Sequence, residues 1–221
     1  MENVIESRQA FFNLSPHEQL DGWAIRNVDL TDLDFGCRQL SSTSISRAGL
    51  VRSRLGGCRI ASSTFQASSM RGVSFRKAHL SEVAFVNCEL IEADLSDASF
   101  TRLEIFESRM TNARFGDSSL VVSSFQSCDL YGADFSRAAL MRVRFVSPKG
   151  QAAELSNVRF EGALLMDVTL RGANLFRASF RNALLLRVNL RDANLVEADF
   201  RGAVLVECDW SLADLDRVKT R

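Results

Sequence analysis

Residues 183–206 read ALLLRVNLRDANLVEADFRGAVLV, and within this stretch a large apolar side chain recurs at every fifth position. The spacing holds from Ile25 to Leu215, where 38 of the 39 residues numbered in multiples of five are Leu, Ile, Phe, Met or Trp; the exception is Gly150. A helix repeats every 3.6 residues and a strand every two, so neither gathers these residues on one side. The pattern predicts a backbone that turns a corner every five residues.

A second series of residues, mostly small, lies two positions before the large ones, as in Ala173, Ala193 and Ala198. The units ADLSDASF, ADFSRAAL and ANLVEADF show both series, with polar residues between them. From about residue 23 to 218 the chain resembles the pentapeptide repeat family, whose A(D/N)LXX units form a right-handed quadrilateral β-helix with four units to a coil. The resemblance implies an all-β solenoid of about nine to ten coils, on the order of 45 Å long at the spacing between β-strands. It also implies that the large and the small residue both point inward.

The composition indicates a single globular domain whose charges balance and produce no strong overall electrostatic field. The 221 residues include 27 Lys and Arg and 27 Asp and Glu, so no net charge steers the chain toward nucleic acid or an anionic membrane. No apolar run reaches the roughly 18 to 20 residues of a membrane span, and the first residues do not resemble a signal peptide. We expect a cytoplasmic protein with no membrane partner.

Two segments depart from the repeat. Residues 1–22 are predicted to form an N-terminal cap over the β-helix of residues 23–221. Within the cap, VIESRQAFFNL can form a short helix, and SPHE at 15–18 has the form of a second helix start. Near residues 147–151 we predict an outward loop, because removing five residues there places seven phenylalanines in one column of nine positions.

Candidate catalytic, cofactor and metal residues are not found. His17 and His79 lie in no catalytic motif, and there is no phosphate-binding loop, G-x-S-x-G or H-E-x-x-H sequence. The five cysteines match no metal-site spacing, and four of them occupy the small inward position. Only Cys37 is expected to react readily with a thiol reagent. We therefore predict a protein that is not an enzyme and holds no cofactor or metal.

Three apolar triplets recur twenty residues apart, at 164–166, 184–186 and 204–206. Twenty residues make one coil, so the flanking members of the triplets point outward on one face in successive coils. With the loop excluded, Met141 and Val121 extend this face over about five coils, roughly 20 Å of axis. The predicted surface, called the apolar strip below, comprises Val121, Met141, Leu164, Met166, Leu184, Leu186, Val204 and Val206.

So large an apolar patch is rarely left to water on a soluble monomer. The strip could be covered in three ways: by a second copy in a homodimer through the C-terminal half, by a different protein, or by the C-terminal tail or the loop folded back over it. A flat face that meets itself favours the two-fold dimer. Further candidate partner contacts are the outward aromatics and the loop, namely Phe106, Tyr131, Phe176, Pro148 and Lys149.

The sequence thus predicts a non-enzymatic protein–protein interaction module, a rigid rod that binds and modulates a protein partner. The alternative comes from the family resemblance, because its Qnr-type members resemble duplex DNA and bind DNA gyrase. Those mimics are strongly acidic, whereas this chain is neutral, and its densest acidic run, residues 82–107, forms a ring around the rod rather than a stripe along it. Direct nucleic-acid binding through the arginines of residues 171–201 is not expected, because acidic residues lie among them.

Overall fold

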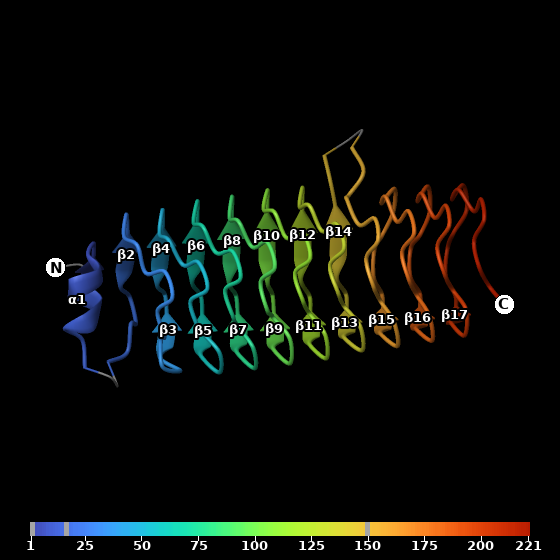
Figure 1. Ribbon diagram of the computed structural model, residues 1–221. Helices are drawn as coiled ribbons and strands as arrows, with labels where there is room; N and C mark the ends of the chain where they lie inside the picture. The colour runs from blue at the N-terminus through green and yellow to red at the C-terminus, as the bar shows by residue number, and fades with distance from the viewer. Residues whose placement is uncertain (1–2, 16–17, 149–150) are drawn as a thin grey trace.

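The protein is a straight rod built of stacked, nearly identical coils (Figure 1). The computed structural model describes residues 3–15, 18–148 and 151–221. It is a right-handed quadrilateral solenoid of about ten turns with all strands parallel, and this confirms the predicted fold class. Strands pair with the strand one coil further along, twenty residues away as in β16 with β17, so the backbone hydrogen bonds run from coil to coil along the rod.

Two parallel sheets form two of the four sides. The eight-stranded sheet contains β1 (Val4–Ile5), β2 (Ala24–Arg26), β4 (Ser44–Ser46), β6 (Thr64–Gln66), β8 (Ala84–Val86), β10 (Glu104–Phe106), β12 (Ser124–Gln126) and β14 (Arg144–Val146). The nine-stranded sheet contains β3 (Gln39–Ser41), β5 (Arg59–Ala61), β7 (His79–Ser81), β9 (Ser99–Thr101), β11 (Ser119–Val121), β13 (Ala139–Met141), β15 (Leu164–Met166), β16 (Leu184–Leu186) and β17 (Val204–Val206). The other two sides are joined by single bridges such as Asn174 to Asn194 and Ser179 to Asp199.

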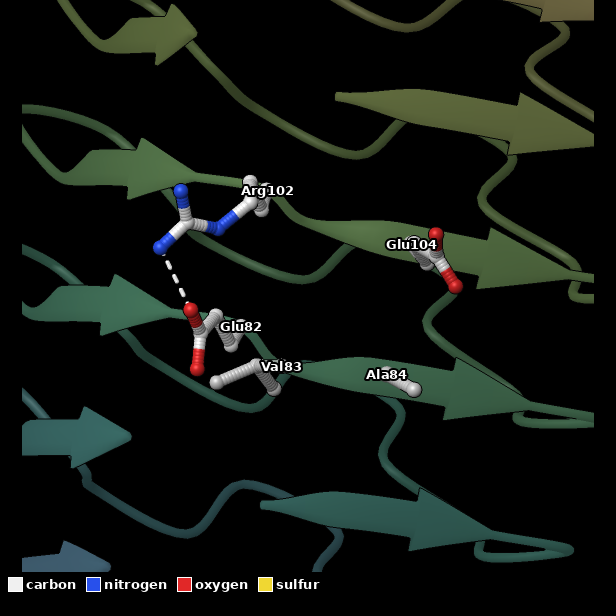
Figure 2. Close-up of a pocket in the computed structure, with 5 residues that line it drawn as sticks. All are labelled: Glu82, Val83, Ala84, Arg102 and Glu104. Atoms are coloured by element: carbon white, nitrogen blue, oxygen red, sulfur yellow. Dashed lines mark hydrogen bonds and ion pairs between the residues drawn. The ribbon is translucent and has the colours of Figure 1, made fainter. Parts of the chain in front are cut away.

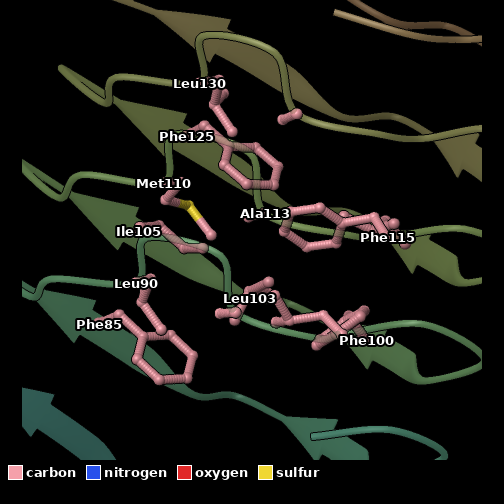
Figure 3. Packing of buried hydrophobic residues seen from close by; sticks show 14 of the residues in the cluster. Phe85, Leu90, Phe100, Leu103, Ile105, Met110, Ala113, Phe115, Phe125 and Leu130 are labelled. Atoms are coloured by element: carbon pink, nitrogen blue, oxygen red, sulfur yellow. The ribbon is translucent and has the colours of Figure 1, made fainter. Parts of the chain in front are cut away.

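The core is a set of columns inside the tube, one below each side (Figure 3). Large side chains such as Phe115 and Phe135 are fully buried and stack with their ring centroids 4.5 Å apart. The small residues two positions before them, such as Ala113 and Ala133, are equally buried. A small residue is needed because the narrow tube has room for only one large side chain on each side of each coil.

Five extra residues enter the chain after β14 without changing the cross-section. Before this point partners are twenty residues apart, whereas Leu140 pairs with Leu165 and Asp134 with Arg159, a separation of twenty-five. Residues 147, 148 and 151–153 carry the chain out from the rod and back (Figure 1). As a result the rings of Phe135 and Phe160 stack at 5.2 Å, and the phenylalanine column continues.

The corners between sides are made by residues in the left-handed backbone region. The residue two positions after the large one has φ near +50°, as in Arg187 (52°), Glu207 (54°) and Val122 (52°). Such a φ is tolerated by Gly, Asn and Asp, but it is a genuine outlier for a β-branched residue. Val122 therefore holds a strained conformation.

The N-terminal residues cover the first coil and also continue the solenoid. Ile5 pairs with Ile25 through β1, and Ile5 and Leu20 are fully buried. One helix, α1 (Arg8–Phe12), replaces one side, and its first turn is capped by the Ser7 hydroxyl, which accepts from the Ala10 N–H. The expected second helix start at 15–18 is wrong for the described part of that segment, since residues 18–20 are not helical; Pro16 and His17 lie outside the described residues.

An arginine ties this cap to the rod. Arg38 occupies an inward position that holds a small residue in the following coils, and it is buried. Its guanidinium lies 4.9 Å from the centroid of the Phe11 ring and donates to the carbonyls of Phe35 and Ser15 at 3.1 Å. The Phe11 ring in turn packs edge-on against Phe35, with centroids 5.0 Å apart. These contacts close the N-terminal end of the core.

Candidate interaction surface

The predicted apolar strip lies on adjacent strands of the nine-stranded sheet, in the order β11, β13, β15, β16 and β17. The residues after the central position align directly: Val121 with Met141, then Met166, Leu186 and Val206. The residues before it form a second row of Ala139, Leu164, Leu184 and Val204. Strand alternation turns the central residues into the core and both flanking rows outward.

The two rows remain partly open to solvent. Val204 is 54% exposed, Val206 44% and Leu184 37%, while the other members are half-buried between their neighbours. The N-terminal half of the same sheet carries polar residues at the corresponding positions, including His79, Ser99 and Thr101. The apolar character is therefore a property of one half of one side, and it does not follow from the repeat itself.

Neither segment that could fold back covers the strip. Residues 147, 148 and 151–153 leave the rod at the corner beyond the eight-stranded sheet, away from β13 and β15 (Figure 1). The C-terminal tail continues a different side, where Lys219 bridges to Asp199 and its N–H donates to the carbonyl of Ala198. Within this chain the strip faces solvent.

Many arginines of the rod pair with a carboxylate one coil away. Arg187 donates to both carboxylate oxygens of Asp167, at 2.7 and 3.0 Å, and these hydrogen bonds hold the pKa of Asp167 below its usual range. Figure 2 shows a shallow hollow where Arg102 pairs with Glu82 beside Glu104. Hydrogen bonds from Arg102 and Ser62 lower the pKa of Glu82 in the same way. Such pairs keep the carboxylates ionised and unsuited to accept a proton near neutral pH.

His79 and the cysteines are spread along the rod. His79 is exposed on β7, with Nδ1 2.7 Å from the Ser99 hydroxyl. Cys58, Cys88 and Cys128 are buried, and burial raises the pKa of the Cys58 thiol to about 12. Cys37 is exposed. In residues 3–15, 18–148 and 151–221, no group of three His, Cys, Asp or Glu side chains is placed to hold a metal ion.

The other predicted contact residues do not join the strip. Phe106 is half-buried on β10 of the eight-stranded sheet, whereas Tyr131 is 47% exposed on a different side. Phe176 lies on the side of Tyr131, two coils further on, where the Arg177 guanidinium lies 4.7 Å from its ring centroid. Pro148 is exposed in the loop, and Lys149 lies outside the described residues. These side chains form no common site.

Family models account for most of this chain. A model described as a pentapeptide repeat region matches residues 78–149, and one described as pentapeptide repeats in eight copies matches residues 153–192 and 193–219. The chain is a pentapeptide repeat protein. A search of curated protein sequences finds no match.

One solved structure, HetL, supports the fold of this pentapeptide repeat protein, and two others are similar in sequence only in part. HetL, involved in heterocyst differentiation regulation in the cyanobacterium Nostoc, is 23% identical with a TM-score of 0.54, over 92% of this chain and 89% of that one. QnrB1, a plasmid-mediated fluoroquinolone resistance protein, is 20% identical with a TM-score of 0.38, over 90% and 89% of the two chains. A protein of the Arabidopsis thaliana thylakoid lumen is 26% identical over 53% of this chain and 68% of its own, with a TM-score of 0.34. Among the described residues of the pentapeptide repeat protein, no helix is long and apolar enough to cross a bilayer.

Sequence reasoning missed the exposed corner residues beside the strip. Arg142, Asp167, Arg187 and Glu207 follow β13, β15, β16 and β17, and all four are exposed. Val122 occupies the same corner after β11 and is 45% exposed. All of these residues occupy the same position of the repeat, so the sequence contains the pattern. Their order along the corner is hard to see in the sequence, because the spacing of twenty residues becomes twenty-five at the loop.

Proposed function

We propose that this pentapeptide repeat protein is a non-enzymatic interaction module, a rigid rod that acts by binding a protein partner through the apolar strip. The observation that carries this proposal is the row of partly exposed aliphatic side chains on β13, β15, β16 and β17. A flat sheet offers these side chains at fixed spacings, so a partner meets a preformed surface with little ordering cost.

Burying the apolar strip against a partner would also be favourable in free energy. Burial of apolar surface contributes about 25 cal/mol for each Å² removed from water, and Val204, Val206 and Leu184 all have area left to bury. Nothing in the repeat requires leucine or valine here, because the polar residues His79, Ser99 and Thr101 occupy equivalent positions on β7 and β9. The apolar choice in the C-terminal half is therefore explained by a contact outside the chain.

A site-specific photo-crosslinker tests the proposal in cells. Position 184 lies on the strip, and the matched control is position 196, a half-buried valine on the opposite side of the rod, two repeat units further along. We expect protein adducts from position 184, with a second copy or with another protein, and few from position 196. Equal yields from the two positions, or none from position 184, would contradict the proposal.

The alternative function, binding to DNA gyrase as a mimic of duplex DNA, has weaker support. Of the seven acidic residues in the ring of residues 82–107, five are paired with arginines, namely Glu82, Glu89, Glu92, Asp94 and Asp97. Paired carboxylates present less negative potential than the phosphates of DNA. We expect the purified protein to leave gyrase supercoiling unchanged at micromolar concentration; inhibition or protection of gyrase would favour the alternative.

A further inference from the structure

The corner beside the apolar strip carries charges of alternating sign along the rod. Arg142, Asp167, Arg187 and Glu207 follow successive strands of the nine-stranded sheet, each with φ between 52° and 55°. The backbone N–H of each of the first three donates to the residue preceding the next corner, so the four lie directly above one another. Arg187 pairs with Asp167 and also interacts electrostatically with Glu207. The order of charges is therefore plus, minus, plus, minus.

When this row of charges faces the same row of a second copy in the reverse direction, each charge lies opposite one of the other sign. If a second copy faces the sheet with its rod axis antiparallel, the two-fold axis runs along the strands, and each row of residues faces the same row in reverse. With the axis between β15 and β16, Arg142 faces Glu207 of the second copy, and Asp167 faces its Arg187. Every corner charge then meets one of opposite sign, and symmetry places each pair twice.

The apolar rows match under the same operation. Met166 meets Leu186 of the second copy, and Met141 meets Val206, while in the other row Ala139 meets the larger Val204. The opposite corner of the sheet carries Arg137, Gly162, Asn182 and Gly202. Three of these are uncharged and two lack a side chain, so reversal places no like charges opposite one another there and permits close approach.

The parallel orientation does not give this match. With the two-fold axis along the rod, the corner of Arg142 faces the other corner of the same coil in the second copy. Arg142 would then lie opposite Arg137, and Asp167 opposite Gly162, which offers it no donor side chain. Like charges that face each other oppose association and select against this orientation.

We propose that the apolar strip binds a second copy of this chain in the antiparallel orientation, centred between β15 and β16, with the corner charges setting the register. This rests on the proposed function, because it names the occupant of the same surface. The strip measures about 20 Å by roughly 10 Å, well below the about 800 Å² that each partner buries in a standard interface. We therefore expect a weak, transient dimer.

A charge-reversal cycle measured by sedimentation equilibrium tests the register. Arg142 and Glu207 are separated by two intervening coils within one chain, about 14 Å along the axis, so direct coupling between them arises only across the dimer. We expect Arg142→Glu and Glu207→Arg each to weaken self-association about ten-fold, because each change sets two like-charge pairs in the interface. The double variant restores it to within about three-fold of the wild type, since both pairs regain opposite signs.

Arg47→Glu is the matched control. It makes the same change of net charge at the corner after β4, far from the apolar strip, and among the described residues no carboxylate lies within ion-pair distance of Arg47. We expect it to leave the association constant unchanged, with circular dichroism confirming the fold of each variant. Additive losses in the double variant, or rescue of Glu207→Arg by Arg102→Glu instead, would overturn the register. A monomeric wild type that still forms adducts from position 184 would overturn self-association and leave the proposed function standing.

Discussion

Replacing Phe135 by alanine tests the stacked core. The Phe135 ring makes more aromatic contacts than the phenylalanine rings at either end of its column. It is fully buried and stacks on Phe115 at 4.5 Å and Phe160 at 5.2 Å between centroids. It also meets Phe125 and Phe145 edge-on, at 6.1 and 5.9 Å. Removing a buried phenylalanine side chain lowers the free energy of unfolding by about 3 to 5 kcal/mol. We expect the upper part of this range, since each aromatic pair adds about 0.5 to 1.5 kcal/mol beyond the area buried.

Guanidinium unfolding, followed by far-ultraviolet circular dichroism and by a second probe to check cooperativity, measures the loss. Phe135→Leu is the graded variant, because Leu55 and Leu95 already occupy the same column; it should cost about 1 to 2 kcal/mol, mainly the lost ring contacts. Phe12→Ala is the control, since Phe12 is 58% exposed, and it should cost under about 1 kcal/mol. A loss below about 1 kcal/mol for Phe135→Ala would refute the reasoning.

Three further predictions concern the corners, acid stability and the thiols. Val122→Asn should raise the free energy of unfolding by about 1 kcal/mol, because asparagine tolerates the φ of +52°; a destabilised variant in the same guanidinium assay would contradict this. Hydrogen bonds from Arg201 lower the pKa of Asp199 to about 2 from 3.8, so the stability that it contributes is present above the higher value and lost as pH falls toward the lower one. An acid titration of Asp199→Asn should accordingly show a smaller loss of stability over that window, and an unchanged profile would argue against the pair. A maleimide should label Cys37 in the native protein and Cys58 only after unfolding, as counted by mass spectrometry; fast native labelling of Cys58 would contradict its burial.

The five-residue spacing predicts the fold well because inward positions have a strict requirement. A coil that encloses a narrow tube needs a large residue and a small one at fixed places, so the signal repeats along the chain. The terminal segment lacks this redundancy. Ile5 and Leu20 stand at multiples of five and are buried, yet helix α1 occupies the side between them. The start signal at Ser15 is overridden, and Arg38 at an inward position is explained only by its contacts with Phe11 and Ser15.

The surface is predicted less completely, since outward positions are under no packing constraint from the chain itself. The triplet 184–186 reveals the apolar strip because two of its leucines have no place in the core. The charges at Arg142, Asp167, Arg187 and Glu207 look like ordinary corner residues in the sequence. Their alternation becomes visible only when the register across the loop is known, since Arg142 and Asp167 are separated by twenty-five residues and the others by twenty.

Light scattering measures the solution mass and so tests self-association through the apolar strip. The wild type and Leu186→Glu are compared over a range of concentrations, with Thr101→Glu, at the equivalent position on β9 of the same sheet, as the control. We expect the mass of the wild type and of the control to rise toward twice that of one chain, whereas folded Leu186→Glu stays monomeric. A wild type that remains monomeric throughout, or a Leu186→Glu variant that associates as strongly as the wild type, would contradict self-association through the strip.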